Sequence, residues 1–366
     1  MVPNTECTNA GGAVVNKLYT SKDLLKGYVA GRPGSYVKTW DFQQFVVFTK
    51  AGGAEPRDLK EAIRQATHDA RISHALGNYL KRNAPAGEKP KLVGIMGGHG
   101  LLRTDQAFKV IADIARDLTR DGYQLVTGGG PGAMEAAHFG AYFAGSTDKA
   151  YAAGLAELQT VPTLANLSPI LNKDGSFAAN QEETIKKAYD WLTAALSARK
   201  MADGEPGVSL AVPTWLYGSE PTTPFASAYA KYFQNSIREE TLVTEGRAGV
   251  LFAQGGGGTL REIFQDVELN YYVTTAEAFT PMIFVDPDGF WSKDAVYDAD
   301  GKVVTRAVKL DAMIPAIFKL ALNNLTPAAQ AACAAKVKFT TDIDAIRGVL
   351  AAHAPVAQRK LAMLLK

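Results

Sequence analysis

The sequence predicts an α/β protein: a Rossmann-like parallel sheet flanked by helices, with an N-terminal extension and an inserted helical segment. Two observations support this prediction. From residue 91 onward, short apolar runs alternate with stretches whose apolar residues have helical spacing, and two successive runs open into glycine-rich loops. Successive units of strand, loop and helix form parallel sheets with helices packed on the sheet faces.

The composition is that of an ordinary globular protein. The chain has 366 residues, 47% of them hydrophobic and 21% charged, and its net charge of +2 indicates no nucleic-acid-binding surface. Cys7 and Cys333 lie far apart in the sequence, which argues against a disulfide framework or a zinc site. No signal peptide is evident, and no apolar run approaches the roughly 18 residues of a membrane helix. We therefore expect a soluble, cytoplasmic protein without membrane contact.

Residues 1–90 form the N-terminal extension, whose role the sequence does not indicate. The apolar run at residues 40–48 is predicted to be a strand, and residues 56–82 have the apolar spacing of one helix. His68 and His74 lie on that helix, where histidines are usually packing or surface residues. Residues 83–90 have the proline and glycine content of a linker.

The first two α/β units occupy residues 92–143. The runs at 92–96 and 123–127 have the length of buried strands, and residues 106–120 have helical spacing. A further helix is expected to follow the second glycine loop and to end at residue 143. Ligands bind beyond the carboxyl ends of strands in such sheets, and both glycine loops are expected at that edge.

The nucleotide-binding region is predicted to span residues 91–350, with an insertion near 145–207 that contains two helices, at 149–158 and 180–197. A helical tail is expected at residues 351–366. Further strands are predicted at residues 208–212, 248–253 and 281–285, and further helices at residues 225–243, 260–272, 312–322, 327–336 and 341–353.

Three glycine-rich loops are candidates for ligand binding. Glycine lets the backbone approach a ligand closely, and the N–H groups of a following helix suit a phosphate. The third loop, which ends in Thr259, is the most specific because four consecutive glycines lie between an apolar run and a helix. The candidate binding residues are Gly97, Gly98, His99, Gly128, Gly129, Gly130, Gly132, Met134, Gly255, Gly256, Gly257, Gly258 and Thr259.

Glu262 and Arg238 are the candidate charged residues of this site, and each has a structural alternative. Thr259 and Glu262 have the spacing of a capping box, in which each satisfies a free backbone donor of the other. Arg238 lies in a helix rich in glutamate and could be a solvated ion-pair partner. In the loop at residues 213–224, Trp215 and Tyr217 could flank a nucleotide base or pack beneath the loop.

Two other site types have weaker support. Gly128, Gly130 and Ala133 match the dinucleotide-binding spacing, and Asp148 lies where a ribose-binding acid is expected, but no strand leads to it. An NAD(P)-dependent oxidoreductase is therefore a minor alternative. Glu135 and His138 have the spacing of half a di-metal site, yet no second copy or third ligand follows. We expect neither a metal nor a cofactor.

The second and third loops, in this order, resemble the LONELY GUY, or lysine-decarboxylase-like, superfamily of phosphoribohydrolases. The runs at residues 94–100 and 130–135 are most similar to bacterial pyrimidine/purine nucleotide 5′-monophosphate nucleosidases. The resemblance covers roughly residues 91–350. Its glycine-loop pattern, Pro-Gly-Gly-x-Gly-Thr-x-x-Glu, places the catalytic glutamate at Glu262 and the upstream arginine at Arg238. Two departures are Gln254, where the family has proline, and Glu239, where many members have lysine.

The resemblance implies hydrolysis of the N-glycosidic bond of a nucleoside 5′-monophosphate to free base and ribose 5-phosphate. The third glycine loop would hold the 5′-phosphate, the second loop and Met134 would approach the ribose and base, and Glu262 would stabilise the cationic sugar. The family also implies a homodimer or higher oligomer. An alternative is a non-catalytic carrier of a phosphorylated pterin such as molybdenum cofactor, which the departure at Gln254 and the long insertion motivate.

Overall fold

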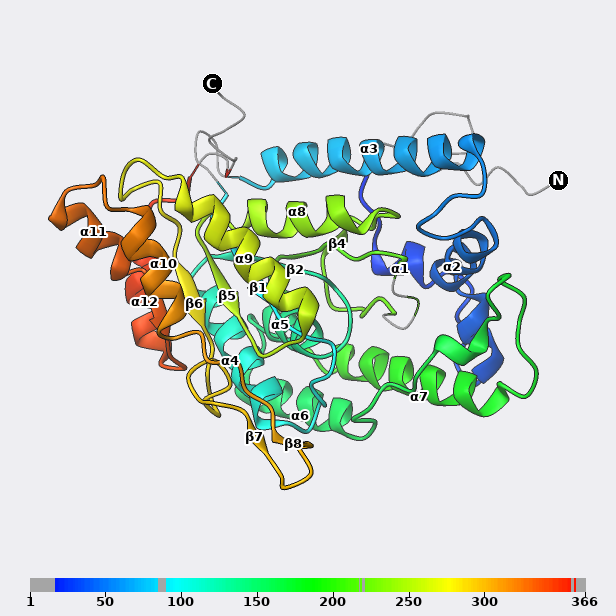
Figure 1. Ribbon diagram of the computed structural model, residues 1–366. Helices are drawn as coiled ribbons and strands as arrows, with labels where there is room; N and C mark the ends of the chain where they lie inside the picture. Colours follow the sequence, from blue (N-terminus) through cyan, green and yellow to red (C-terminus); the bar gives the residue numbers. More distant parts are fainter. Residues whose placement is uncertain (1–16, 85–89, 217, 219–220, 357–358, 360–366) are drawn as a thin grey trace.

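The computed structural model describes residues 17–84, 90–216, 218, 221–356 and 359. Its centre is a seven-stranded sheet in the order β4-β3-β2-β1-β5-β6-β9, and all neighbouring strands are parallel (Figure 1). This confirms the α/β, Rossmann-like fold class. The strands are β1 (Leu92–Met96), β2 (Gln124–Thr127), β3 (Ser209–Ala211), β4 (Ala228–Tyr229), β5 (Gly249–Phe252), β6 (Met282–Phe284) and β9 (Val337–Phe339).

The strand order reverses direction at β1. The chain adds β2, β3 and β4 on one side of β1, and then crosses to add β5, β6 and β9 on the other. Met96 and Phe252 are paired at the carboxyl ends of β1 and β5. The loops that follow these two strands therefore start from adjacent points, at the edge of the sheet where open α/β sheets bind ligands.

Both faces of the sheet are buried, which explains why its strands are apolar throughout. Val93 and Ile95 of β1 point into one core cluster, whereas Leu92 and Met96 point into the other. This alternation is the period of a strand, and a parallel sheet covered on both faces needs apolar side chains at every position.

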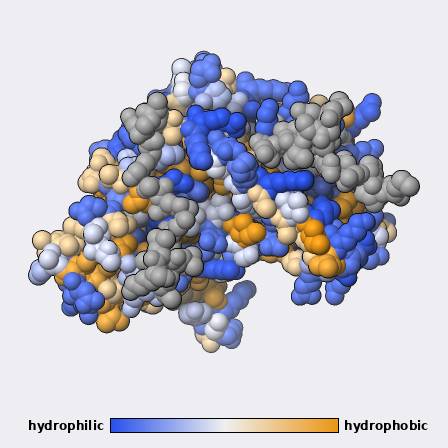
Figure 2. All heavy atoms as spheres, turned by 90° about the horizontal axis from the view of Figure 1, so that it is seen from above, coloured by the Kyte–Doolittle hydropathy of each residue, from blue (hydrophilic) through white to orange (hydrophobic). Residues whose placement is uncertain are grey.

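Helices form a layer on each face of the sheet (Figure 1). The core of one face includes side chains of α3 (Leu59–Arg82), α8 (Asn235–Glu245), α9 (Gly257–Tyr271) and α10 (Met313–Ala321). The core of the other face includes side chains of α4 (Gln106–Arg120), α5 (Ala133–Tyr142), α6 (Asp148–Gln159) and α12 (Ile343–Ala351). Seen from the α3 side, the surface is mostly hydrophilic and its apolar side chains lie in small groups (Figure 2).

The N-terminal extension packs against the insertion. A third core cluster joins Tyr36 of the short helix η1 (Pro33–Lys38) and Phe42 of α2 (Trp40–Lys50) to Trp191 of α7 (Glu182–Arg199). The insertion also contains η2 (Ser168–Ile170). The extension further includes α1 (Ser21–Leu24), and Tyr19 just before it forms an antiparallel bridge with Tyr229 of the edge strand β4. The extension thus contacts both the insertion and the sheet.

The prediction of a strand at residues 40–48 was wrong, because this segment is helix α2. The Thr39 side chain accepts a hydrogen bond from the Phe42 N–H and caps the start of the helix. Phe42 and Val46, four residues apart, are buried in the cluster shared with the insertion. The apolar run therefore provides a helical face, and its length alone did not distinguish the two structures.

Several short strands were missed. Residues 225–243 were predicted to be one helix, but the segment contains β4 and only then α8. The region after residue 286 was predicted to be helical, whereas β9 lies between α11 (Pro327–Ala334) and α12, and β7 (Val296–Tyr297) pairs with β8 (Val303–Thr305). Strands of two or three residues are too short to show the alternation on which sequence prediction depends.

The ends of other helices and strands differ from the predictions by a few residues at most. Strand β1 and helix α4 have the predicted bounds, whereas α3 starts at Leu59 because the Asp58 side chain accepts the Glu61 N–H and caps the helix. Within the described ranges, no helix is both long enough and apolar enough to cross a membrane.

A glycine at the contact between α4 and α5 provides a test of this packing. A Cβ at Gly140 would overlap the Ala112 carbonyl oxygen, which belongs to a backbone that cannot easily move. We expect Gly140→Ala to lower the free energy of unfolding by about 1–3 kcal/mol, as overpacking does. Gly77→Ala in α3 is the control, since its Cβ meets nothing within 4 Å and helix propensity should raise stability by up to about 1 kcal/mol. Equal denaturant midpoints for the two variants would contradict the α4–α5 packing.

Candidate functional site

The loops after β1 and β5 touch at the point where the strand order reverses. The Gly98 N–H donates to the Gln254 carbonyl oxygen at 3.0 Å. A Cβ at Gly98 would lie only 2.9 Å from the Gly255 Cα, so a larger residue would separate the loops. Two of the three predicted glycine loops are therefore in contact at this edge of the sheet.

The loop after β2 joins them from the other side. The Ala133 N–H donates to the Gly98 carbonyl oxygen at 3.1 Å. Gly132 has a φ of 72° and a Cβ there would lie 2.9 Å from the Cα of His99, an exposed residue. Gly129, which also has positive φ, accepts the Thr223 N–H at 3.2 Å. All three glycine loops thus meet, and Gly130 of the second loop is buried.

The start of α9 is open to solvent. Gly256 is the N-cap residue and makes no side-chain cap, and Gly256, Gly257 and Gly258 are exposed with nothing within 4 Å of an added Cβ. The first N–H groups of a helix have no partner within it, and the helix dipole favours negative charge there. This first turn is therefore suited to a phosphate or another anion.

The capping-box interpretation of Thr259 and Glu262 was wrong. Thr259 is the third residue of α9 and is buried, with its hydroxyl packed beneath Gly255. A capping box needs the threonine at the N-cap position, which Gly256 occupies. Glu262, one turn further along the helix, is therefore not engaged in capping.

Glu262 instead pairs with Arg238. The Arg238 Nη1 lies 3.2 Å from the Glu262 Oε1, although 24 residues separate the two in sequence. Arg238 is 7% exposed and Glu262 is 5% exposed. Because Arg238 is buried, the alternative of a solvated ion-pair partner was wrong. The neighbouring Glu239 pairs with Arg261 instead, at 2.8 Å.

Two further contacts fix the Arg238 guanidinium. Its Nε donates to the Val212 carbonyl oxygen, just beyond β3, at 3.1 Å, and its Nη2 lies 3.9 Å from the Met134 Sδ. A Cβ at Gly128 would overlap the Nη2 and come within 2.5 Å of the Met134 sulfur. The second glycine loop is therefore packed directly against the ion pair.

Glu135 and His138 do not form half of a metal site. The Arg103 guanidinium binds Glu135 with two hydrogen bonds of 2.8 and 2.6 Å and lies over the Trp191 ring. The His138 Nδ1 is 2.9 Å from the Ser209 hydroxyl oxygen, and burial lowers the pKa of His138 to about 3. In the part of the chain that the structure describes, no three His, Cys, Asp or Glu side chains are grouped to hold a metal.

Asp148 does not have the position of a ribose-binding acid at the end of a strand. It lies in the first turn of α6, its side chain is 88% exposed, and it pairs with Arg116 at 2.8 Å. The next strand of the sheet, β3, begins only at Ser209. The second loop therefore lacks the strand-borne acid of the dinucleotide fingerprint.

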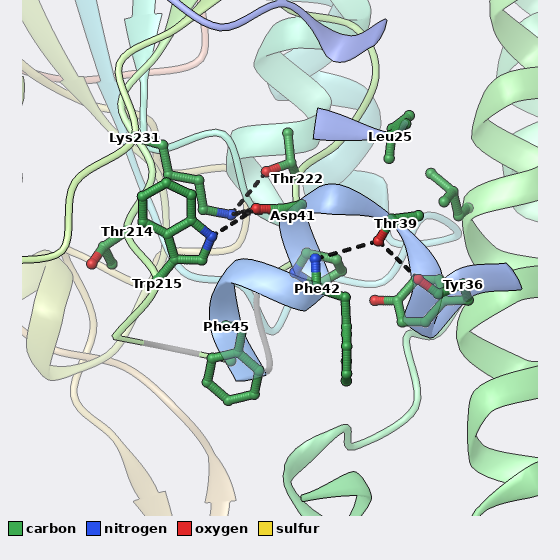
Figure 3. A pocket seen from close by; sticks show the side chains of 13 residues that line it. Leu25, Tyr36, Thr39, Asp41, Phe42, Phe45, Thr214, Trp215, Thr222 and Lys231 are labelled. Carbon is green, nitrogen blue, oxygen red and sulfur yellow. Dashed lines mark hydrogen bonds and ion pairs between the residues drawn. The ribbon is translucent and has the colours of Figure 1, made fainter. Parts of the chain in front are cut away.

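Trp215 packs beneath its loop. It is 2% exposed, and its indole Nε1 donates to the Asp41 Oδ1 at 2.9 Å (Figure 3). Lys231 reaches the same carboxylate at 2.7 Å, at the wall of a pocket between α2 and the loop after β3. Tyr217, its predicted companion, lies outside the described residues. Asp41 and Lys231 were not singled out from the sequence, because nothing in an apolar run signals that a charged residue within it is paired.

The buried His138 gives a pH-dependent expectation. Its pKa is about 3 in the fold against an ordinary value of 6.5, so the unfolded chain binds more protons between these values. The stabilisation from neutral His138 should therefore be fully present above pH 6.5. The free energy of unfolding should fall as the pH drops toward 3, by up to about 1.4 kcal/mol per pH unit.

The measurement is the free energy of unfolding against pH for the wild type and for His138→Asn. In the variant, the free energy of unfolding should fall less steeply as the pH drops. Part of the remaining fall should come from His353, because burial lowers its pKa to about 4. His74→Asn, at an exposed position on α3, is the control. An unchanged slope in His138→Asn would contradict the buried, neutral state of this histidine.

Comparisons with known proteins show little. No family model matches the chain, and no curated protein matches it. Among solved structures, the molybdenum cofactor binding protein from the phototrophic bacterium Rippkaea orientalis is similar at 12% sequence identity. The match covers 72% of this chain and 97% of that protein, with a TM-score of 0.35. A likeness at this level carries no argument about function.

Proposed function

We propose that the protein hydrolyses the N-glycosidic bond of nucleoside 5′-monophosphates and releases a free base and ribose 5-phosphate. The observation that supports this most directly is the position of the buried Arg238–Glu262 pair, with Glu262 five residues along α9 from an open, glycine-lined helix start. One end of the site suits a phosphate, and the other presents a carboxylate.

The phosphate would bind at the first turn of α9. Residues Gly256 to Gly258 are exposed, and the helix dipole adds a favourable field. Gly257 and Glu262 are five residues apart on the helix, which corresponds to an axial rise of about 7.5 Å. A nucleotide whose phosphate lies at the helix start can therefore extend its sugar toward the carboxylate.

Glu262 would act on the sugar. Cleavage of a glycosidic bond passes through an oxocarbenium-like state in which positive charge develops at the anomeric carbon. A fixed carboxylate stabilises that charge and can orient a water molecule toward the carbon. The water oxygen then bonds to the anomeric carbon, the carbon–nitrogen bond breaks, and the leaving nitrogen carries away the electron pair and receives a proton released by the water.

Arg238 would hold the carboxylate and contact the substrate. Its hydrogen bonds to the Val212 carbonyl and to Glu262 leave little freedom for either charged group. Such preorganisation matters because a polar group that must reorient during the reaction stabilises the transition state less. Gly128 and Met134, packed against the guanidinium, would lie near the ribose and base.

The two departures from the family pattern leave this arrangement intact. Gln254 contributes its carbonyl oxygen to the contact with Gly98, and a proline would offer the same oxygen. Glu239 pairs with Arg261 and Asn235 and does not take part in the contacts given for Arg238. The proposal includes a cytoplasmic location and a homodimer or higher oligomer, and requires no metal or cofactor.

Replacing Glu262 by glutamine tests the mechanism. The amide keeps the shape of the side chain but cannot stabilise a cation, so ribose 5-phosphate release should fall by about 100-fold or more. The measurement is the rate of release from a panel of AMP, GMP, CMP and UMP. Glu268→Gln, an exposed change on the same helix, is the control and should retain wild-type rates. Full turnover by Glu262→Gln would overturn the role of this carboxylate.

The panel also separates the alternatives. If the wild type releases no ribose 5-phosphate and native mass spectrometry finds a co-purifying phosphorylated pterin, the protein is a carrier and the hydrolase proposal fails. If neither NAD nor NADP raises the melting temperature at millimolar concentration, the oxidoreductase alternative is removed.

A further inference from the structure

A buried carboxylate of the N-terminal extension holds the start of α8. Asp69, in the middle of α3, has no exposed surface, and its two oxygens accept the Phe233 and Gln234 N–H groups at 3.0 and 2.9 Å. Gln234 is the N-cap residue of α8 and provides no side-chain cap of its own. Asp69 therefore fixes the backbone at the start of α8, the helix that carries Arg238.

The Asp69 carboxylate is itself held in place. The His68 Nδ1 lies 2.8 Å from the Asp69 Oδ1, and the His68 Nε2 lies 2.9 Å from the Tyr19 hydroxyl. Tyr19 in turn exchanges backbone hydrogen bonds with Tyr229 of β4, at 3.1 and 2.9 Å. These contacts connect the extension continuously to the sheet.

A second buried carboxylate holds other residues of the chain between β3 and α8. Asp41 of α2 accepts the Trp215 indole N–H at 2.9 Å and the Lys231 ammonium at 2.7 and 2.9 Å. Figure 3 shows the three side chains converging, and the ammonium also donates to the Thr222 hydroxyl oxygen at 3.1 Å. Asp41 thus joins the loop after β3 to the residues that follow β4.

The chain between β3 and α8 contacts the candidate site near both of its ends. Val212, at its start, accepts the Arg238 Nε hydrogen bond, and Arg238 itself lies just beyond its end. Thr223, in its middle, donates to Gly129 of the second glycine loop. The geometry of the guanidinium therefore depends on how the chain between β3 and α8 is held.

We infer that the N-terminal extension is part of the catalytic apparatus, with Asp69 and Asp41 as positioning residues for Arg238. Neither carboxylate reaches the site, and both act through the backbone and side chains of the segment between Val212 and Arg238. This inference rests on the proposed hydrolase function for its kinetic readout. It assigns a role to residues that lie outside the region of family resemblance.

The experiment uses the full chain with Asp69→Ala and Asp69→Asn. Alanine leaves the Phe233 and Gln234 N–H groups without their acceptors, whereas asparagine keeps one oxygen. We expect kcat to fall at least about tenfold in Asp69→Ala and less in Asp69→Asn, because a misplacement of about 1 Å can cost about 100-fold. Asp58→Asn, at the exposed cap of the same helix, is the matched control and should keep the wild-type kcat.

A double-mutant cycle with Arg238→Ala separates positioning from general destabilisation. If Asp69 acts through Arg238, Asp69→Ala should lower kcat no further once Arg238 is absent. Equal losses in the wild-type and Arg238→Ala backgrounds would overturn the inference. Should Asp69→Ala fail to fold, the same cycle is run with Asp69→Asn.

Hydrogen exchange of the α8 amides supplies a readout that is independent of catalysis. Exchange at the start of α8 should rise in both Asp69 variants and stay unchanged in Asp58→Asn. A wild type that releases no ribose 5-phosphate would sink the hydrolase proposal, while the exchange data would still decide whether Asp69 holds α8. Wild-type kcat and exchange in both Asp69 variants would overturn the positioning role and leave the proposed function standing.

Discussion

The candidate site is built around the buried ion pair between Arg238 and Glu262. Arg238 comes from α8 and Glu262 from α9, and both are buried where the second glycine loop packs against them. A buried pair of opposite charges is tolerated only when its geometry is held and its remaining polar atoms are satisfied. The Val212 carbonyl and the Met134 sulfur contribute to this. The absence of a Cβ at Gly128 is a steric requirement of the pair as much as of any ligand.

The sequence predicted those parts of the fold that have long periodic signals. Strand β1 and helix α4 were predicted with their correct bounds, because a continuous apolar strand and a strongly amphipathic helix are each distinctive. The first two glycine loops were also predicted to lie at the same edge of the sheet, and Gly98 and Ala133 are in contact there. The carboxyl ends of parallel strands lie at one edge of the sheet, so the loops after β1, β2 and β5 lie at the same edge.

The contacts that could not be predicted are those between segments distant in sequence. Asp41 and Asp69 lie in segments whose patterns indicate only secondary structure. The N–H groups of Trp215 and Phe233 that they accept come from more than 160 residues away. Nothing in a local window distinguishes a buried, paired carboxylate from an exposed one. The same reasoning applies to Glu262, whose spacing from Thr259 also fits a capping box. The structure excludes that role, because α9 begins at Gly257 with Gly256 as its N-cap residue.

The bridge between Tyr19 and Tyr229 has a consequence for the solubility of shortened chains. Strand β4 lies at the edge of the sheet, and an uncovered edge strand presents backbone donors and acceptors to any other strand it meets. Tyr19 covers that edge, and Leu76 and Leu80 of α3 are buried in the core on one face of the sheet. A fragment that begins at residue 91 would expose both a pairing edge and an apolar face, so the segment that resembles a complete domain in sequence is expected to self-associate when isolated.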